Sequence, residues 1–478
     1  MIRTRFAPSP TGDPHIGNIR SALFAFLFAK KNATDRGEFF LRIEDTDRER
    51  HNEGSIEVIK EALRWLEIIP ENIDDPIIQS ERLLIYKEAA LKLVAEDKAY
   101  VCNCSKERLE QVRAERQAKK LPPMYDKHCR DLALPFEDDC VIRMKIPQNK
   151  KISFDDLVRG NVEFDSSTID DQVILKSDGF PTYHLAHVVD DSAMEISHVS
   201  RGEEWLPSTP NHILLHQRLG FTQPEYAHLP VILSPTGGKL SKRDGAVGIM
   251  EYKKLGYLPE AVVNFMLFLG WSPKTNDEIL IDPVDFHFGN AAVAFSSEFK
   301  FENVNKAPAV FDINKLNHIN HYYLLNTMVN DPDIRTDYKS KILREFSVDN
   351  LTNGELEILG RGGFITLLEM ANYIKKLRIP PEYDNAILVF KKSTLEATKI
   401  GLEASYEKLE KLDDWSAETT ETALKQAIEE NSLSNGDAFW PIRVALSGEE
   451  KSPSPTELLV ALGKVESLKR ISKAIGIL

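Results

Sequence analysis

The N-terminal segment constrains the fold of this chain more than any other part. Residues 4–7 have the composition of a short strand, and residues 8–14 are rich in Pro and Gly, which favour a turn. Apolar side chains then recur at helical spacing to about Lys30, and residues 38–43 alternate polar and apolar side chains as a second strand does. A strand, a helix and a strand in close succession predict a parallel βαβ unit, whose ligands bind beyond the carboxyl ends of the strands.

Later segments extend this pattern and then replace it with helices. Strand-like stretches return at residues 173–175, 196–200 and 228–233, and the segment 209–219 begins with the Thr-Pro of a helix start and is followed by Gly. From about Tyr252 onward strand signals vanish, and apolar residues recur at helical spacing to the end of the chain. The sequence therefore predicts an α/β region followed by an all-helical one.

The segment in between differs in character. Residues 99–172 hold all four cysteines, a charged helix at 106–120 and a strand-like stretch at 141–146. This change of composition within an α/β pattern indicates an inserted α+β domain.

Composition narrows the class of protein. The chain has 478 residues, enough for about three to five domains, and no apolar run approaches the ~20 residues of a membrane span. Four cysteines are too few for a disulfide framework in so long a chain, which favours a reducing compartment such as the cytoplasm. A net charge of −14 does not exclude RNA binding, because an acidic protein can still carry a basic stripe.

Two short segments more than 200 residues apart carry the chemistry. In residues 8–18 a Pro/Gly turn leads into a helix with His15 at its start, where free N–H groups and the helix dipole favour a phosphate. Residues 239–243 form a loop with three cations in five residues. Each is weak evidence alone, because a capping His or a solvated basic loop has the same sequence. Together they indicate one site that holds a nucleotide triphosphate from two sides.

In this order and spacing, the two segments resemble the signatures of class I aminoacyl-tRNA synthetases. The flanking residues are similar to those of bacterial glutamyl-tRNA synthetases, and the resemblance covers essentially the whole chain. The further matching stretches are residues 5–14, 42–47, 176–186 and 201–205. The resemblance implies a multidomain α/β fold, with a Rossmann-like parallel-sheet catalytic domain, an inserted α+β domain and an all-α C-terminal anticodon-binding region.

The resemblance also implies where the domains begin and end. The two halves of the catalytic domain would be residues 1–98 and 173–250, and the inserted domain, which would bind the tRNA acceptor end, residues 99–172. A helical domain that contacts the tRNA stem would follow at residues 251–318, and the anticodon-binding region at residues 319–478.

The implied reaction joins ATP and L-glutamate to form glutamyl-adenylate and pyrophosphate, with Mg²⁺ accompanying the ATP. The glutamyl group would then pass to the 3′ end of tRNA(Glu). The expected catalytic residues are His15, Gly17, Lys239 and Lys242. Contacts to ATP would come from the same four residues and from Asn18, Glu204, Trp205 and Ser241. Asn18 departs from the His of the general class I signature, a position at which glutamyl enzymes vary.

Glutamate itself calls for two cations and one anion. Paired Arg residues match its two carboxylates bidentately, and a carboxylate such as Glu44 suits its ammonium group. The resemblance implies that Arg5 and Tyr183 bind the side-chain carboxylate and that Arg201 holds the α-carboxylate. The full expected set of glutamate-binding residues is Arg5, Ser9, Glu44, Tyr183, His187 and Arg201. His187 stands where many relatives have Asn, which changes the hydrogen bonds that this position can offer.

A third constellation is a candidate metal site. Cys102, Cys104 and Cys129 can supply three zinc ligands, and some glutamyl-tRNA synthetases carry this pattern with a tyrosine, here Tyr125, as the fourth. The alternative is a set of reduced structural cysteines without metal. Cys140 stands apart, and we expect it to be a small buried residue.

Alternatives to the glutamate-activating enzyme are a non-catalytic RNA-binding paralogue and a relative that glutamylates another tRNA. A non-catalytic paralogue is opposed by the presence of Arg5, His15, Lys239 and Lys242. A truncated relative that glutamylates a modified tRNA base lacks an anticodon-binding region, and the long helical C-terminal region here opposes it. The glutaminyl enzyme typically ends in β-barrels, which the sequence does not indicate. We expect a monomer in the cytoplasm that binds L-glutamate and tRNA(Glu) and no membrane. Whether tRNA(Gln) is also charged, whether zinc is bound and which C-terminal residues read the anticodon are left open by the sequence.

Overall fold

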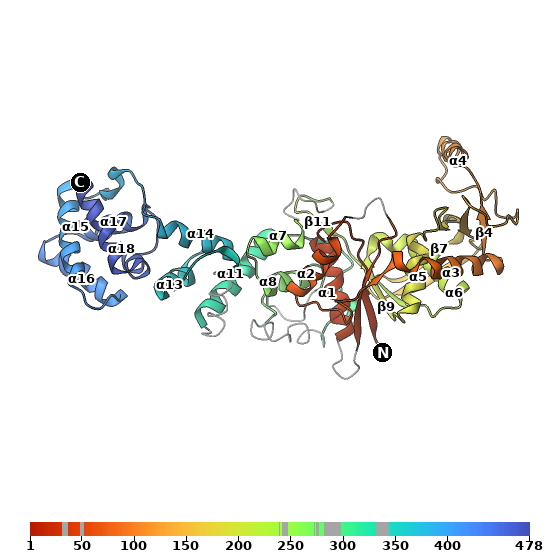
Figure 1. The fold of residues 1–478 in the computed structure, drawn as a ribbon, viewed down its shortest axis with the longest axis horizontal. Helices are drawn as coiled ribbons and strands as arrows, with labels where there is room; N and C mark the ends of the chain where they lie inside the picture. The colour runs from red at the N-terminus through yellow and green to blue at the C-terminus, as the bar shows by residue number, and fades with distance from the viewer. Residues whose placement is uncertain are drawn as a thin grey trace. The chain divides into compact units, whose positions relative to one another are not determined.

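The structure is a computed structural model that describes residues 1–30, 37–47, 52–238, 240, 247–271, 273, 277–281, 298–330 and 344–478 (Figure 1). The chain divides into two compact units. The first consists of Met1–Tyr252 and Val262–Leu316, and the second of Lys253–Ala261 and Asn317–Leu478.

The N-terminal βαβ unit is confirmed. Strand β1 (Arg3–Phe6) precedes helix α1 (Ile16–Lys30) in the sequence, strand β2 (Glu38–Ile43) follows it, and the two strands pair in parallel. Strand β2 also pairs in parallel with β3 (Ile77–Ile78). Helix α1 is buried along most of its length because its sequence is apolar on almost every side. The carboxyl ends of β1 and β2 therefore open at the same edge, where the turn before α1 also lies.

Two further sheets complete the first unit. One has the order β7 (Gly160–Asp165), β6 (Lys151–Asp156), β10 (Glu225–Leu229), β9 (His198–Gly202), and the other the order β4 (Ala99–Cys102), β5 (Val141–Met144), β8 (Val173–Leu175). Strands from residues 99–172 therefore pair with strands that come much later: β6 pairs in parallel with β10, and β5 pairs in antiparallel with β8. The segment that differs in composition is joined to its surroundings by main-chain hydrogen bonds.

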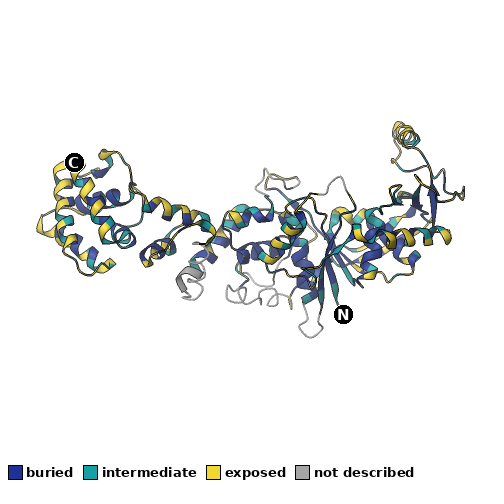
Figure 2. Cartoon of the chain, in the orientation of Figure 1, coloured by how far each residue is buried: buried dark blue, intermediate teal, exposed yellow. Residues whose placement is uncertain are grey.

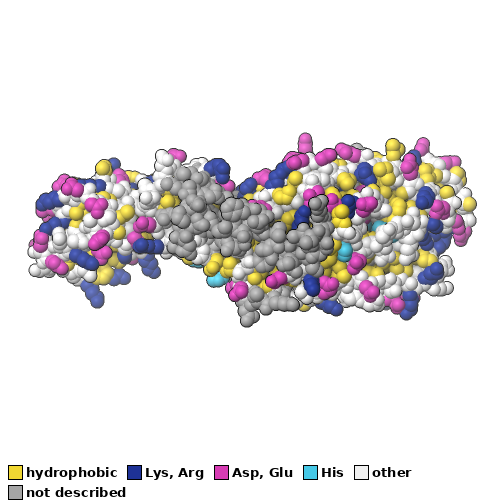
Figure 3. Space-filling view, turned by 90° about the horizontal axis from the view of Figure 1, so that it is seen from below, with side chains coloured by type: hydrophobic (Ala, Val, Ile, Leu, Met, Phe, Trp, Pro, Cys, Tyr) yellow, Lys and Arg dark blue, Asp and Glu magenta, His cyan; other side chains and the backbone are white. Residues whose placement is uncertain are grey.

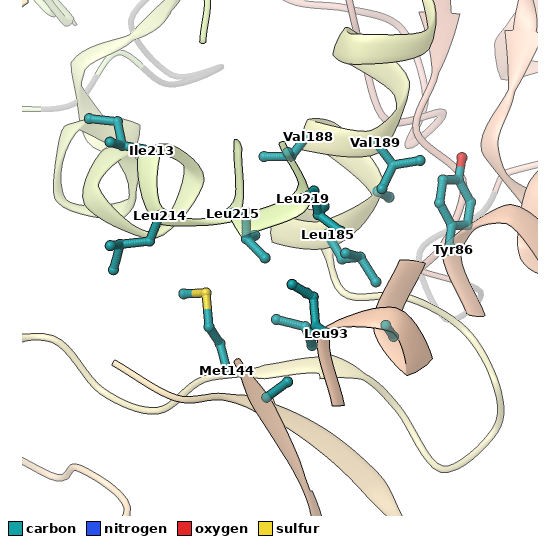
Figure 4. Close-up of a cluster of buried hydrophobic side chains, with 14 of the residues drawn as sticks. Tyr86, Leu93, Met144, Leu185, Val188, Val189, Ile213, Leu214, Leu215 and Leu219 are labelled. Atoms are coloured by element: carbon teal, nitrogen blue, oxygen red, sulfur yellow. The ribbon is translucent and has the colours of Figure 1, made fainter. Parts of the chain in front are cut away.

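A hydrophobic core lies between three helices and the β4-β5-β8 sheet. Helices α3 (Leu83–Ala95), α5 (Tyr183–Ala193) and α6 (Thr209–Leu219) direct side chains such as Leu93, Leu185 and Leu215 into it, and Met144 of β5 closes it from the sheet side (Figure 4). Helix α6 ends at Gly220, whose φ of 75° suits glycine and ends the helix as the sequence predicts. This packing fixes α5, which carries two of the predicted site residues, Tyr183 and His187.

Two details of the sequence prediction are wrong. The strand predicted at 228–233 is two strands, because Pro230 separates β10 from β11 (Ile232–Leu233) and lacks the N–H that a continuous ladder needs. Strands also continue beyond Tyr252, because β12 (Ala309–Val310) pairs in parallel with β11. A strand of two residues is too short to show an alternating pattern. The other α-helices described in the first unit are α2 (Ser55–Trp65) and α4 (Lys106–Ala118), while α7 (Ile249–Lys254) and α8 (Pro259–Leu267) each include residues of both units.

The second unit is helical where the structure describes it, as predicted. Its elements are the later part of α11 (Ile313–Asn330), then α13 (Asn353–Arg361), α14 (Leu367–Arg378), α15 (Leu395–Glu410), α16 (Ala417–Glu430), α17 (Asn435–Ser447) and α18 (Pro455–Ile477). Capping boxes begin several of them, as at Thr352–Glu355 and Ser454–Glu457. Helices α13 to α18 bury one side and expose the other (Figure 2).

The surface charges and the lengths of the apolar helices can be compared with the composition. Basic and acidic side chains are intermingled on the face drawn in Figure 3. Among the described residues, no helix is both long enough and apolar enough to cross a membrane.

Candidate active site

A buried cluster of charges lies at the carboxyl ends of β1 and β2. Asp191 of α5 accepts hydrogen bonds from Arg5 Nε at 3.2 Å and from Arg42 Nη1 at 2.5 Å. Arg42 also donates to Glu44 Oε1 at 2.9 Å, and all four side chains are at most 9% exposed. Although burial alone would raise the pKa of Asp191, Arg5 and Arg42 hold it below its usual value. The cluster thus places two guanidinium groups against one carboxylate in the interior.

His187 lies between these arginines and Asp191. Its Nδ1 is 3.4 Å from Arg5 Nη2 and 3.4 Å from Arg42 Nη2, while its Nε2 is 3.4 Å from Asp191 Oδ2. Burial and the neighbouring arginines lower the pKa of His187 well below its usual value, so the ring is neutral. The simplest tautomer accepts at Nδ1 from the arginines and directs Nε2–H toward Asp191. Nδ1 of the ring is therefore engaged by the arginines, whereas Nε2 makes no hydrogen bond of good geometry among the described residues.

Asp190, the neighbour of Asp191, anchors α5 to the preceding helical segment. Its carboxylate accepts from Gln79 Nε2 at 2.8 Å, Arg82 Nε at 2.8 Å and Tyr86 Oη at 2.7 Å. Burial and Asp190 raise the pKa of Tyr86, so the phenol stays a donor. The anchor fixes the position of α5 beneath the site.

Arg201, at the end of β9, is the centre of a second buried network. It donates from Nε to His228 Nε2 at 3.1 Å and from Nη2 to Thr209 Oγ1 at 2.9 Å. Its Nη1 lies 3.1 Å from both Tyr183 Oη and His212 Nδ1. Arg201 is only 6% exposed, and these contacts hold its guanidinium plane in one orientation.

Tyr183 and Trp205 form the wall between this network and solvent. Their ring centroids are 4.3 Å apart, and Trp205 is 37% exposed. They border an open cleft of about 550 Å³ that extends to α4. The cleft is lined by Leu109, Arg113, Arg143, Asp170, Gln172, Val173, Thr182, Tyr183, His184 and Trp205. Substrate-sized groups can therefore reach Tyr183 from outside.

The start of α1 has the geometry expected of a phosphate site. Gly17 N–H donates to His15 Nδ1 at 3.0 Å, which leaves the proton of a neutral ring on Nε2. A Cβ at position 17 would lie 2.9 Å from His15 Cε1, so glycine is required for the ring to fold over the helix start. Asn18 donates its backbone N–H to His15 O, and its buried side-chain Oδ1 has no partner among the described residues.

The remaining predicted site residues are exposed or lie outside the described residues. Ser9 is exposed in the turn before α1, and the neighbouring Pro8 carbonyl accepts from Glu44 N–H at 3.0 Å. Glu204 is exposed and its carboxylate folds back over Gly202. The loop residues Lys239, Ser241 and Lys242 lie outside the described residues.

The cysteine cluster forms as the spacing suggests. The thiol sulfurs of Cys102, Cys104 and Cys129 lie within 4.8 Å of one another, and Tyr125 Oη is 3.4 Å from Cys102 Sγ and 3.3 Å from Cys104 Sγ. Burial raises the pKa of the Cys104 thiol to about 11 and also raises that of Tyr125. Three sulfurs and a phenolic oxygen that converge on one point fit a tetrahedral zinc ion, which would displace their protons. Cys140 is buried and apart from them, as predicted.

Comparison with known proteins decides which family this architecture represents. Residues 1–318 match the family model described as tRNA synthetases class I (E and Q), catalytic domain, and residues 361–475 match an anticodon binding domain. A protein named glutamate–tRNA ligase from Dehalococcoides mccartyi is 43% identical, with 99% of this chain and 98% of that protein covered. The chain belongs to the glutamate–tRNA ligase family.

Other members of the glutamate–tRNA ligase family agree over the full length. The protein of that name from Alkaliphilus metalliredigens is 40% identical over 98% of this chain and 97% of its own. A crystal structure of a glutamate tRNA ligase from Elizabethkingia meningosepticum, in complex with its amino acid, superposes with a TM-score of 0.85 at 35% identity, covering 99% of each chain. The predicted fold class, a parallel-sheet catalytic domain with an all-helical C-terminal region, is thereby confirmed.

Within this glutamate–tRNA ligase fold, several residues of the site escaped the sequence analysis. They are Arg20, Arg42, Asp156, Asp190, Asp191, Thr209, His212 and His228. The adjacent acidic pair 190–191 within an apolar helix was the one visible signal, because a buried charge needs a partner. Arg20 instead ties α1 to later segments by donating to the carbonyls of Leu269 at 2.8 Å and Pro230 at 2.6 Å.

Proposed function

We propose that this chain activates L-glutamate with ATP to glutamyl-adenylate and pyrophosphate, and transfers the glutamyl group to the 3′ end of tRNA(Glu). The observation that carries the proposal is the pair of buried, oriented guanidinium groups of Arg5 and Arg201 with the carboxylate of Glu44 close by. Two cations and one anion complement the two carboxylates and the ammonium group of glutamate. A neutral amino acid of the same shape would lack the second carboxylate that these two cations complement.

In the first step, the glutamate α-carboxylate attacks the α-phosphorus of ATP and pyrophosphate leaves. His15 and the first N–H groups of α1 would bind phosphate oxygens, and Lys239 and Lys242 would neutralise the charge that develops on them. Mg²⁺ would accompany the triphosphate as part of the substrate. No side chain needs to form a covalent bond, because orientation and charge neutralisation lower the barrier.

The second step requires the tRNA acceptor end to reach the adenylate. The cleft beside Tyr183 is the route we propose, because the exposed Arg113 in its wall can meet a backbone phosphate. The C-terminal helices would bind the anticodon, whose unpaired bases are read by stacking and edge hydrogen bonds. The domain limits at residues 98, 172, 250 and 318 remain our proposal for how these tasks divide.

The test is charging of purified tRNA(Glu) with radiolabelled glutamate, with and without ATP. We expect acylated tRNA with glutamate and none with glutamine. Parallel reactions with tRNA(Gln) determine whether this second tRNA is also a substrate. A failure to acylate either tRNA, by protein that retains its native circular dichroism spectrum, would refute the proposal and favour a non-catalytic paralogue.

We also propose that Cys102, Cys104, Tyr125 and Cys129 bind one Zn²⁺ ion with a structural role. Metal analysis of protein purified without chelator should give close to one zinc per chain, and Cys102→Ser should abolish it, while Cys140→Ser should retain it. Absence of metal from the native protein would leave these cysteines as reduced structural residues.

The compartment and the oligomeric state complete the proposal. We propose a monomer that works in the cytoplasm, where free cysteines stay reduced. Sedimentation equilibrium of the free protein should give the mass of one chain, 54.2 kDa. A concentration-dependent dimer would refute the monomer.

A further inference from the structure

We propose that Asp156 and His228 are positioning residues for glutamate binding, which hold Arg201 in the orientation that the substrate carboxylate requires. This inference rests on the proposed function, because it assigns a task to residues behind a glutamate-binding arginine. Neither residue needs to touch substrate, cofactor or reacting atoms.

Asp156, at the end of β6, is a saturated carboxylate. It is 3% exposed, and its Oδ1 accepts the backbone N–H groups of Val158 at 3.0 Å and Arg159 at 2.8 Å. Its Oδ2 lies 3.1 Å from the backbone N of His228 and 2.6 Å from His228 Nδ1. The backbone bonds fix where the carboxylate lies, and the short contact to the ring is then available for orienting His228.

The carboxylate determines which nitrogen of His228 carries the proton. An ionised Asp156 can only accept, so Nδ1 must be the donor and the Nε2 lone pair of a neutral ring faces Arg201 Nε. His228 is fully buried, and burial lowers its pKa, which keeps the ring neutral. A neutral ring with this tautomer is what the arginine donor needs, because the other tautomer would set N–H against N–H.

The pair holds one edge of the Arg201 guanidinium, because Nε is bound by His228. Nη1 meets Tyr183 Oη and His212 Nδ1, each at 3.1 Å. Nη2 meets Thr209 Oγ1 at 2.9 Å and the Trp205 carbonyl at 3.5 Å. The Trp205 contact is long, and a carboxylate that displaces it gains a charged, bidentate partner. An arginine that could rotate about its side-chain torsions would have to lose that freedom when glutamate binds.

This geometry makes the two substrates of the first step respond differently. The Asp156–His228–Arg201 chain leads to the amino-acid carboxylate, whereas the nucleotide elements around His15 lie at the start of α1. Substitutions that break these hydrogen bonds should therefore weaken glutamate binding and leave ATP binding unchanged. A merely structural role would disturb both substrates together, or neither.

The variants are chosen to distinguish a positioning role from a merely structural role. Asp156→Asn keeps an oxygen acceptor for the backbone N–H groups but offers no anionic partner to fix the ring. His228→Leu removes the acceptor for Arg201, and His228→Gln can place an amide oxygen near the position of Nε2. The matched control is Asp171→Asn, which alters a buried carboxylate whose partners are Tyr100, Arg130 and Ile146.

The measurement is the KM for glutamate and for ATP in charging of saturating tRNA(Glu), with glutamate binding by calorimetry as the second readout. We expect Asp156→Asn and His228→Leu to raise the KM for glutamate about 10- to 100-fold, because a buried donor loses its acceptor. His228→Gln should recover most of that loss. The KM for ATP in every variant, and both constants in Asp171→Asn, should stay within about twofold of the native protein.

The inference is overturned if Asp156→Asn and His228→Leu leave the glutamate KM unchanged, or if they raise both KM values equally. Should Asp156→Asn fail to fold, the difference between His228→Gln and His228→Leu decides alone, and equal constants for these two would refute the inference. A native protein that charges no tRNA would refute the proposed function instead. Calorimetric glutamate binding by the same variants would then still test the positioning pair.

Discussion

Asp191→Asn is the substitution from which we expect the largest local loss of stability. The carboxylate lies 3.2 Å from Arg5 Nε and 2.5 Å from Arg42 Nη1, and it is 1% exposed. At an effective dielectric constant of about 20, each pair of unit charges about 4 Å apart contributes ~4 kcal/mol. Restoring the hydration of the carboxylate on unfolding offsets several kcal/mol of this, so removal of one partner of a buried pair costs about 3–5 kcal/mol.

Hydrogen–deuterium exchange measured by mass spectrometry gives this cost locally. Peptides that cover α5 and β1 should lose protection by about 3–5 kcal/mol, while peptides from α15 to α18 in the second unit provide an internal reference. The control is Asp178→Asn, since Asp178 is exposed, 3.7 Å from Lys176 Nζ, and its pair should contribute at most about 1 kcal/mol. A loss below about 1 kcal/mol for Asp191→Asn would refute the reasoning that Arg5 and Arg42 depend on this charge.

The same substitution should change the response to acid. Because Arg5 and Arg42 lower the pKa of Asp191 in the folded state, its stabilisation is fully present above the unfolded pKa of about 4. That stabilisation is lost as the pH falls through the lower folded-state pKa. Unfolding followed between pH 5 and pH 2 should therefore show a shallower acid limb for Asp191→Asn than for the native protein.

Three further substitutions test the assigned roles. Burial raises the pKa of Glu44 despite the nearby Arg42, so Glu44→Gln should cost less than about 1 kcal/mol of stability while raising the KM for glutamate; a large fall in melting temperature would contradict this. Arg5→Ala should weaken glutamate use by about 2–5 kcal/mol and leave the KM for ATP unchanged, whereas an unaltered glutamate KM would show that Arg5 is no ligand. Lys242→Ala, chosen from the sequence alone, should reduce the charging rate at least ~10²-fold with little change in glutamate affinity, and near-native turnover would exclude its role in the transition state.

Local sequence patterns predicted the structural elements that depend on only a few neighbouring residues. The βαβ unit follows from a Pro/Gly turn between a strand and a helix, and α6 ends at Gly220 because the chain turns there with a positive φ. Prediction of these two features needs no knowledge of distant partners. The cysteine cluster is different, because Cys104 and Tyr125 are 21 residues apart and the resemblance, not a local pattern, implied Tyr125 as a ligand.

Long-range pairings escaped prediction for a physical reason. Asp156 and His228 are 72 residues apart, and neither has a local signal that differs from an ordinary polar residue. Position 187 was singled out from the sequence as a glutamate-binding residue, but its neutral ring between two arginines depends on burial that only the packed helix α5 creates. The pairing of β11 with β12 similarly joins two strands too short to be visible in the sequence.

The order in which the strands pair has a consequence for synthesis on the ribosome. Arg3 of β1 exchanges backbone and side-chain hydrogen bonds with Ser197, which is made 194 residues later. At 5–20 residues per second, the nascent N-terminal strand waits roughly 10–40 s for that neighbour. By the same reasoning, Asp156 waits on the order of 4–14 s before its partner His228 is made 72 residues after it. The amino-acid site therefore cannot be complete before residue 228 has been made, and slow translation through residues 156–228 would prolong the exposure of an unpaired strand edge to other nascent chains.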